Sequence, residues 1–136
     1  MISHTFLGVN DFALAFTFYE AVLGELGLNL RFRDEARPWA GWQTPGVPRP
    51  LFLIGRPFDG AAASAGNGTM VALLAADRAT VDRAYAAALR HGGCSEGAPG
   101  LREHYHPDYY GAYFRDPDGN KLGVCCHQPE ADTAYA

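Results

Sequence analysis

The chain has 136 residues, and its 48% hydrophobic and 19% charged residues are typical of one compact globular domain. The formal net charge at pH 7 is −4 and Lys121 is the single lysine, which argues against nucleic acid as the main partner because phosphates are bound by clustered cations. No apolar run reaches the length of about 18 residues that a membrane helix needs, and residues 1–6 lack a signal-peptide pattern, so we expect a cytoplasmic protein without a membrane partner.

In chain order, the hydrophobic pattern predicts a strand, a helix and three strands, and then the same series again. The strands of the first half are expected near residues 2–9, 28–33, 38–43 and 51–56. Residues 58–67 are rich in glycine, alanine and serine, and we interpret them as a linker. The strands of the second half are expected near residues 69–75, 97–103, 109–115 and 121–127.

Each half contains one helix, recognised by apolar residues at helical spacing. In the first helix these residues are Phe12, Phe16, Tyr19, Leu23 and Leu26, and in the second they are Val81, Tyr85, Ala88 and Leu89. Asn10 or Asp11 can cap the first helix and Asp77 the second, since short polar side chains accept hydrogen bonds from free helical amides. Gly24 or Gly27 can end the first helix.

The two halves are related by an interval of 66 residues, which carries Gly27 to Gly93 and His4 to Met70. Units of about 65 residues are too small for good separate cores, so we expect them to share one. The chain is therefore predicted to form a single domain over residues 1–136, made of two modules at about residues 1–57 and 68–128.

Three stretches of the sequence carry a family resemblance: residues 2–11 at the opening strand, residues 18–24 in the first helix and residues 116–122 at the closing hairpin. They resemble the vicinal oxygen chelate superfamily, the group of glyoxalases, bleomycin-resistance proteins and extradiol dioxygenases. The resemblance implies an α+β fold, in which two βαβββ modules form a curved, cavity-enclosing mixed sheet with the helices outside. It also implies a homodimer, in which strands of both chains often complete each cavity.

In metal-using members of this superfamily, the ligands come from the first strand of each module and from the last strand. By resemblance these positions are His4, Met70 and Gly123, and an optional fourth position falls near Phe52. Only His4 can bind a hard divalent ion, because a thioether is a weak, soft ligand and the other two side chains offer no donor. Catalytic metal sites generally have about three protein ligands. We therefore expect no metal cofactor, with His4 as the only retained candidate ligand.

Other side chains leave a rearranged metal site open as an alternative. His104 and His106 are two positions apart, so in a strand they would share a face. Cys125 and His127 follow Gly123 on one strand face and would point toward the rim of the cavity. Such a site would suit a divalent-metal-dependent lyase, isomerase or dioxygenase, although His-x-His pairs on strands more often bind substrate or form hydrogen bonds.

Cysteine chemistry has little support in the sequence. None of the three cysteines lies in a C-x-x-C pair, and the adjacent Cys125 and Cys126 would point to opposite faces of a strand. We interpret the cysteines as small apolar residues rather than as a disulfide framework. A nucleophilic Cys–His pair is a further alternative.

Aromatic residues suggest a cavity for a small amphipathic ligand, because tyrosine and histidine combine an apolar body with a polar tip. Four tyrosines fall within nine residues, at Tyr105, Tyr109, Tyr110 and Tyr113, and alternation should turn about half of them toward the helices. Trp39 and Trp42 are three apart in a predicted strand, so they should face opposite ways, and one could line the cavity.

The hypothesis from the sequence is a protein that binds a small organic molecule in the sheet cavity without the usual divalent metal. The predicted ligand-binding residues are His4, Met70, His104, His106, Tyr109, Tyr113, Gly123 and Cys125. Whether the protein is an enzyme, for example a glyoxalase-like lyase or dioxygenase, stays open at this point. A third interpretation is an interaction module whose pocket performs no chemistry.

Overall fold

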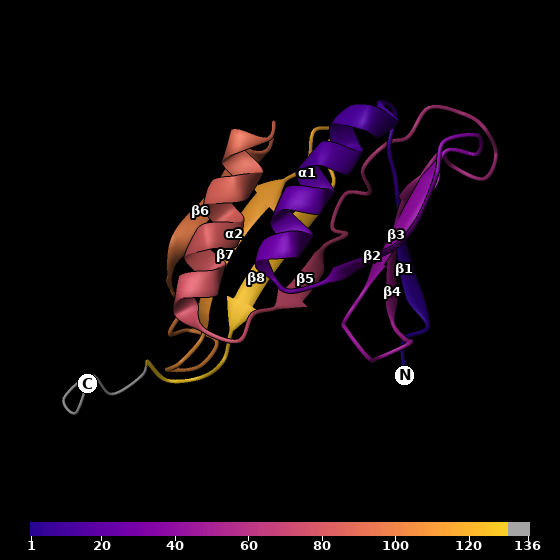
Figure 1. The fold of residues 1–136 in the computed structure, drawn as a ribbon. Helices are drawn as coiled ribbons and strands as arrows, with labels where there is room; N and C mark the ends of the chain where they lie inside the picture. Colours follow the sequence, from indigo (N-terminus) through magenta and orange to yellow (C-terminus); the bar gives the residue numbers. More distant parts are fainter. Residues whose placement is uncertain (131–136) are drawn as a thin grey trace.

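The computed structural model describes residues 1–130, which form two helices and eight strands in two βαβββ modules (Figure 1). The first module consists of β1 (His4–Gly8), α1 (Phe12–Glu25), β2 (Asn29–Asp34), β3 (Trp39–Gln43) and β4 (Leu51–Gly55). The second consists of β5 (Val71–Leu74), α2 (Arg78–Arg90), β6 (Cys94–Leu101), β7 (Tyr110–Arg115) and β8 (Lys121–Cys126). The predicted α+β fold class and the order of its elements are confirmed.

Each module has its own four-stranded mixed sheet, with strand orders β1-β4-β3-β2 and β5-β8-β7-β6. The first strand of each module runs parallel to the last, and the other neighbours are antiparallel. Figure 1 shows α1 and α2 side by side, with the first sheet on the side of α1 and the second behind α2. The helices thus join the modules, and in residues 1–130 no strand of one sheet contacts a strand of the other.

The helices cover one face of each sheet, and we call the opposite face the open face. On the first sheet, the open face carries His4, Phe6, Trp39, Gly41 and Leu53. On the second sheet, it carries Ala72, Gly111, Tyr113, Gly123 and Cys125. The residues that alternate with these along the strands pack against the helices.

The local signals for both helices act as the sequence indicates. The Asp11 carboxylate accepts a hydrogen bond from the third backbone amide beyond it, at 3.1 Å, and Asp77 does the same at 2.8 Å. Of the alternatives open in the sequence, Asp11 is therefore the cap of α1. Gly27 follows the helix with a φ of 81° and Gly92 follows α2 with a φ of 95°, a conformation that glycine adopts without strain.

One hydrophobic core spans both modules. Phe18 and Tyr19 of α1 are fully buried, and the Phe18 ring lies 6.1 Å from the ring of Phe114 on β7, measured between centroids. Leu122 and Val124 of β8 belong to the same core. Because each module contributes side chains to one cluster, neither half buries its apolar surface alone.

A buried polar cluster also joins the modules. Asp116 accepts hydrogen bonds from the Tyr19 hydroxyl and from the Asn120 side-chain amide, at 2.5 and 2.8 Å. The same Asn120 amide donates to the Gly8 carbonyl at the end of β1, at 3.0 Å. Burial, and then the neighbouring Asp116, raise the pKa of Tyr19 well above its usual range, so its hydroxyl stays a donor. The closing hairpin is thus a structural contact between modules.

Two details of the helices and strands differ from the prediction. Leu89 is 41% exposed, because the buried side of α2 is formed by smaller residues such as Ala84 and Ala88. Strand β6 begins at Cys94, earlier than expected, and irregular pairing on both sides of Gly97 interrupts its alternation. Within residues 1–130, neither helix is long and apolar enough to cross a membrane.

Candidate functional site

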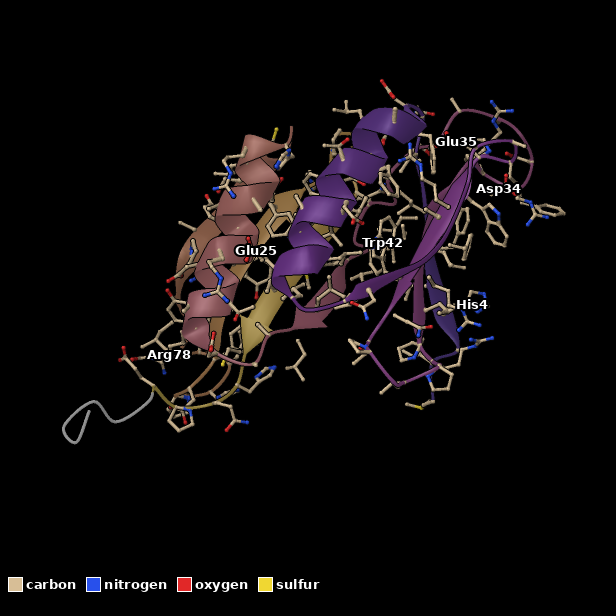
Figure 2. All side chains as sticks on the ribbon, viewed as in Figure 1. His4, Glu25, Asp34, Glu35, Trp42 and Arg78 are labelled. Atoms are coloured by element: carbon tan, nitrogen blue, oxygen red, sulfur yellow. The ribbon has the colours of Figure 1, made fainter. Side chains whose placement is uncertain are left out.

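A cavity of about 880 Å³ lies on the open face of the first sheet. His4, Phe6 and Gly8 of β1 form part of its floor, and Trp39 and Leu53 from the neighbouring strands extend it. Figure 2 shows His4 on the far side of β1 from α1, whereas Trp42 lies between α1 and the sheet. The two tryptophans therefore face opposite ways, as predicted, and Trp39 is the one that lines the cavity.

Residues 56–64 form the other wall of this cavity. The Asn10 side chain holds them there, because it accepts a hydrogen bond from the Ala63 amide at 2.7 Å and donates to the Ala63 carbonyl at 3.2 Å. A Cβ atom on Gly8 would lie 3.1 Å from the Ala63 Cβ, so the absence of a side chain at residue 8 permits this close packing. The sequence predicts only a linker here, and its wall-forming role depends on contacts between distant residues.

The His4 imidazole is exposed at the edge of the cavity. Its Nδ1 atom lies 3.0 Å from the Ser3 hydroxyl oxygen, close enough for a hydrogen bond. In the tautomer that accepts from Ser3, the Nε2 atom carries the proton and can donate to a ligand. A neutral His4 would thus act as a hydrogen-bond donor on the open face.

The open face of the second sheet carries a connected cluster of Tyr109, Tyr113 and Cys125. The Tyr109 hydroxyl lies 2.8 Å from the Tyr113 hydroxyl and 3.0 Å from the Cys125 Sγ. Burial raises the pKa of Tyr109 far above its usual range, and the hydrogen bonds with Cys125 and Tyr113 raise it further. Tyr109 therefore acts as a neutral hydrogen-bonding group at physiological pH.

His104 and His106 lie in the loop between β6 and β7 and not in a strand. They therefore do not share a strand face, which the rearranged metal site would need. The His106 Nε2 atom lies 2.8 Å from the Nδ1 atom of His127, which follows β8. The His106 Nδ1 atom accepts from the Asp108 amide at 3.2 Å, so Nε2 carries the proton and donates to His127. His104 is exposed instead, and its ring packs 4.2 Å from that of Tyr105, between centroids.

Met70 and Gly123 lie next to the start of β5 and within β8, respectively. Met70 immediately precedes β5 and is 42% exposed. Gly123 lies beneath the Tyr113 ring, where a Cβ atom would meet a ring carbon at 3.1 Å. Larger side chains at residue 123 would displace this tyrosine.

The expected equivalence of Phe52 with the last-strand ligand position is wrong. Phe6 pairs with Leu53 in the first sheet, and Ala72, 66 residues after Phe6, pairs with Gly123 in the second. Leu53 is therefore the counterpart of Gly123, whereas Phe52 is 4% exposed and packs in the core. Leu53 lies 70 residues before Gly123 and Phe52 lies 71 residues before it, so sequence spacing missed the position by one residue.

Within one chain, the predicted site residues fall into two groups. His4 lies on the open face of the first sheet. The other seven lie on the second sheet, beside it, or in its β6–β7 loop: Met70, His104, His106, Tyr109, Tyr113, Gly123 and Cys125. Since strands of the two sheets do not touch in residues 1–130, a single chain does not bring His4 together with the other group.

The family's ligand positions do not fit a divalent ion. They hold His4, Met70, Gly123 and Leu53, and only the first offers a suitable donor. Among residues 1–130, no three or more histidine, cysteine, aspartate or glutamate side chains are grouped closely enough to hold an ion.

Paired βαβββ modules with a cavity on a sheet face define a protein of the vicinal oxygen chelate type. The family model described as Glyoxalase/Bleomycin resistance protein/Dioxygenase superfamily matches residues 1–124, and the chain belongs to this superfamily. A comparison with curated proteins found no match.

Solved structures with the same fold cover most of the chain. A glyoxalase/bleomycin resistance protein from Albidiferax ferrireducens T118 is 33% identical, with a TM-score of 0.82 over 94% of this chain and 99% of that chain. A glyoxalase-related enzyme from Fulvimarina pelagi is 18% identical (TM-score 0.70; 93% of this chain, 87% of that one). A lactoylglutathione lyase from Agrobacterium tumefaciens is 22% identical (TM-score 0.62; 93% and 92%), and these last two likenesses concern the fold alone.

Proposed function

We propose that this protein binds a small organic molecule against the open faces of its sheets, without the divalent metal centre of metal-using relatives. The cavity beside His4 carries this proposal, because its volume of about 880 Å³ lies in the range of small-molecule sites and its walls combine aromatic with polar groups. The proposed ligand-binding residues remain His4 on the first sheet and the seven residues of the second group.

We also propose that the working form is a homodimer. The open faces carry exposed apolar side chains, among them Phe6 on the first sheet and Leu74 on the second. Exposed apolar patches of this kind favour association with another surface. A second copy that placed its second sheet opposite the first sheet would bring His4 near the tyrosine cluster, which one chain alone does not do.

Elemental analysis of protein purified without metal, with and without added zinc, nickel and iron, tests the metal-free proposal. We expect less than one tightly held ion per chain and unchanged unfolding temperatures. About one ion per chain that is lost in His4→Ala would overturn it. A thermal-shift screen against small organic molecules tests binding itself, because a ligand specific to the folded state stabilises that state. Failure of every compound would favour the interaction module instead.

A metal-dependent lyase, isomerase or dioxygenase with a rearranged ligand set is the second candidate. The pair of imidazole nitrogens on His106 and His127, 2.8 Å apart, favours it, since an ion that displaced the proton between them could bind both, with a further ligand from elsewhere. This candidate predicts metal binding that His127→Ala abolishes and His91→Ala leaves intact. The same elemental analysis on these two variants separates it from the first.

A further inference from the structure

We propose that the ligand of the first-sheet cavity is a planar aromatic carboxylate, whose carboxylate is bound by Arg37 and Arg56 and whose ring lies against Trp39. This inference rests on the proposed function and adds the chemical class of the ligand. It is carried by the unpaired arginines, the scarcity of acids and the aromatic surface of the cavity.

The two arginines of the cavity lack the polar partners that most arginines of this chain have. Seven of the ten have a side-chain or carbonyl partner within residues 1–130: Arg31, Arg33, Arg49, Arg78, Arg83, Arg102 and Arg115. No such partner is present in that range for Arg37, Arg56 or Arg90, and the first two of these line the cavity. A chain of net charge −4 thus presents two unpaired cations in one cavity.

Within residues 1–130, the nearby acids form no ion pair with these arginines. Asp59 is the only acidic residue among the described lining residues, and its carboxylate accepts a hydrogen bond from the Ala61 amide at 2.9 Å. Asp34 pairs with Trp39 at the end of the first sheet opposite His4, and Glu35 follows it there, but neither acid is among the described residues that line the cavity (Figure 2). Asp34 accepts from a backbone amide and Glu35 pairs with Arg33, so both carboxylates already have partners. The cavity therefore favours an anion, because a guanidinium forms paired hydrogen bonds with a carboxylate.

The apolar part of the cavity is aromatic. The Trp39 ring lies 4.6 Å from that of Phe32, between centroids, which holds it upright on the sheet. The Arg37 guanidinium carbon lies 4.3 Å from the Trp39 ring centroid, so cation and ring form one surface. Phe6 and the exposed Phe58 extend that surface. A flat ring with an attached carboxylate would match this surface, because the ring can pack against the aromatic side chains and the carboxylate can bind the guanidinium groups.

The second open face also places cations beside an aromatic ring, although Arg102 bonds to the Ala98 carbonyl and Glu96 pairs with Arg115 nearby. The Arg102 guanidinium lies 5.6 Å from the Tyr113 ring centroid, and the Lys121 ammonium nitrogen lies 5.7 Å from it. In the proposed dimer, two cationic aromatic faces would meet. An anion between them would offset their repulsion, whereas a cationic ligand would add to it.

Calorimetric titration with three matched probes tests the charge preference. 4-Hydroxybenzoate, 4-hydroxybenzamide and 4-hydroxybenzylamine share a ring and carry a negative, a neutral and a positive group. We expect the carboxylate to bind at least about tenfold tighter than the other two. Acetate, which lacks the ring, should bind more weakly than 4-hydroxybenzoate.

Equal or tighter binding of the amide or the amine would overturn the inference and leave the proposed function standing. Absence of heat from the carboxylate at about 10 mM would also overturn the inference. The proposed function has a separate test: it would be contradicted if no compound of the broader thermal-shift screen changed the unfolding temperature.

Arginine variants locate the interaction. Arg37→Gln and Arg56→Gln should each weaken 4-hydroxybenzoate binding about tenfold, because each removes one charge-assisted hydrogen-bonding group. Arg90→Gln, which removes the unpaired arginine outside the cavity, is the matched control and should leave affinity unchanged. Arg56→Glu should reverse the order of the carboxylate and the amine. An equal loss of 4-hydroxybenzoate affinity in all three glutamine variants, or no loss in the two cavity variants, would contradict the assignment. Circular dichroism would verify that the variants fold.

Discussion

At the scale of single residues, the hydrogen bonds of the second open face concentrate on the Tyr109 hydroxyl. It is the shared partner of Tyr113 and Cys125, at 2.8 and 3.0 Å, and Cys125 is only 3% exposed. When a buried polar group loses its hydrogen-bond partner, the loss of stability exceeds the net contribution of that hydrogen bond. The reason is that no water molecule replaces the lost partner. Tyr109 is therefore a residue whose removal should affect two neighbours.

We predict that Tyr109→Phe lowers the free energy of unfolding by about 1–2 kcal/mol, since one substitution leaves both neighbouring groups without this partner. Urea denaturation followed by circular dichroism would measure the change. Tyr105→Phe is the matched control, because Tyr105 is 62% exposed, and it should change stability by less than about 0.5 kcal/mol. An unchanged Tyr109→Phe would show that the cluster does not stabilise the fold.

At the scale of elements, the segment of residues 56–64 acquires its position from two other elements. Asn10, between β1 and α1, bonds to both backbone groups of Ala63. The backbone amide of Asn10 in turn donates to the Asp118 carboxylate of the β7–β8 hairpin, at 2.9 Å. A segment without regular structure is thus held by one side chain, and the cavity wall depends on that residue.

We predict that Asn10→Ala accelerates hydrogen exchange of the amides in residues 57–64, because the Ala63 amide loses its acceptor. The exchange of α1 and α2 amides should stay unchanged. Asn67→Ala alters an exposed asparagine in the same linker and serves as the control. Equal protection of residues 57–64 in Asn10→Ala and the wild-type protein would contradict the role given to Asn10.

At the scale of the whole molecule, the helices unite the modules on one side and leave both open faces accessible on the other. Helix α1 packs against α2, and the closing hairpin bonds to α1 and to the end of β1. The open faces do not cover one another within residues 1–130. The homodimer proposal accounts for this arrangement, since a second copy could cover both faces.

We predict that the wild-type protein is a dimer in solution and that Leu74→Lys shifts it toward monomer. Leu74 is 73% exposed at the end of β5 on the second open face, and a lysine there would place a charge in the proposed contact. Leu89→Lys is the matched control, because Leu89 is 41% exposed on α2, away from both open faces. Sedimentation velocity would measure the masses. A monomeric wild-type protein, or equal effects of both variants, would contradict the proposal.

The helices and strands could be predicted from the sequence because the patterns that specify them are local. The helical spacing from Phe12 to Leu26, the caps at Asp11 and Asp77, and the tight turn before Lys121 each act within a few residues. Repetition of these signals at an interval of 66 residues also related Phe6 to Ala72, and these two residues occupy equivalent places in β1 and β5. The fold class followed from the family resemblance, whereas the strand order within each sheet came from the structure.

Only the tertiary structure decided which of these residues meet. In the structure, His106 contacts His127 and not His104. The counterpart of Gly123 is Leu53 and not Phe52. Residues 56–64 line the same cavity as His4 and Trp39. The physical reason is that strand pairing, loop length and side-chain hydrogen bonds connect residues far apart in the chain, whereas sequence patterns report nearby neighbours. Composition therefore indicated an aromatic site, and packing decided that its two parts lie on separate faces.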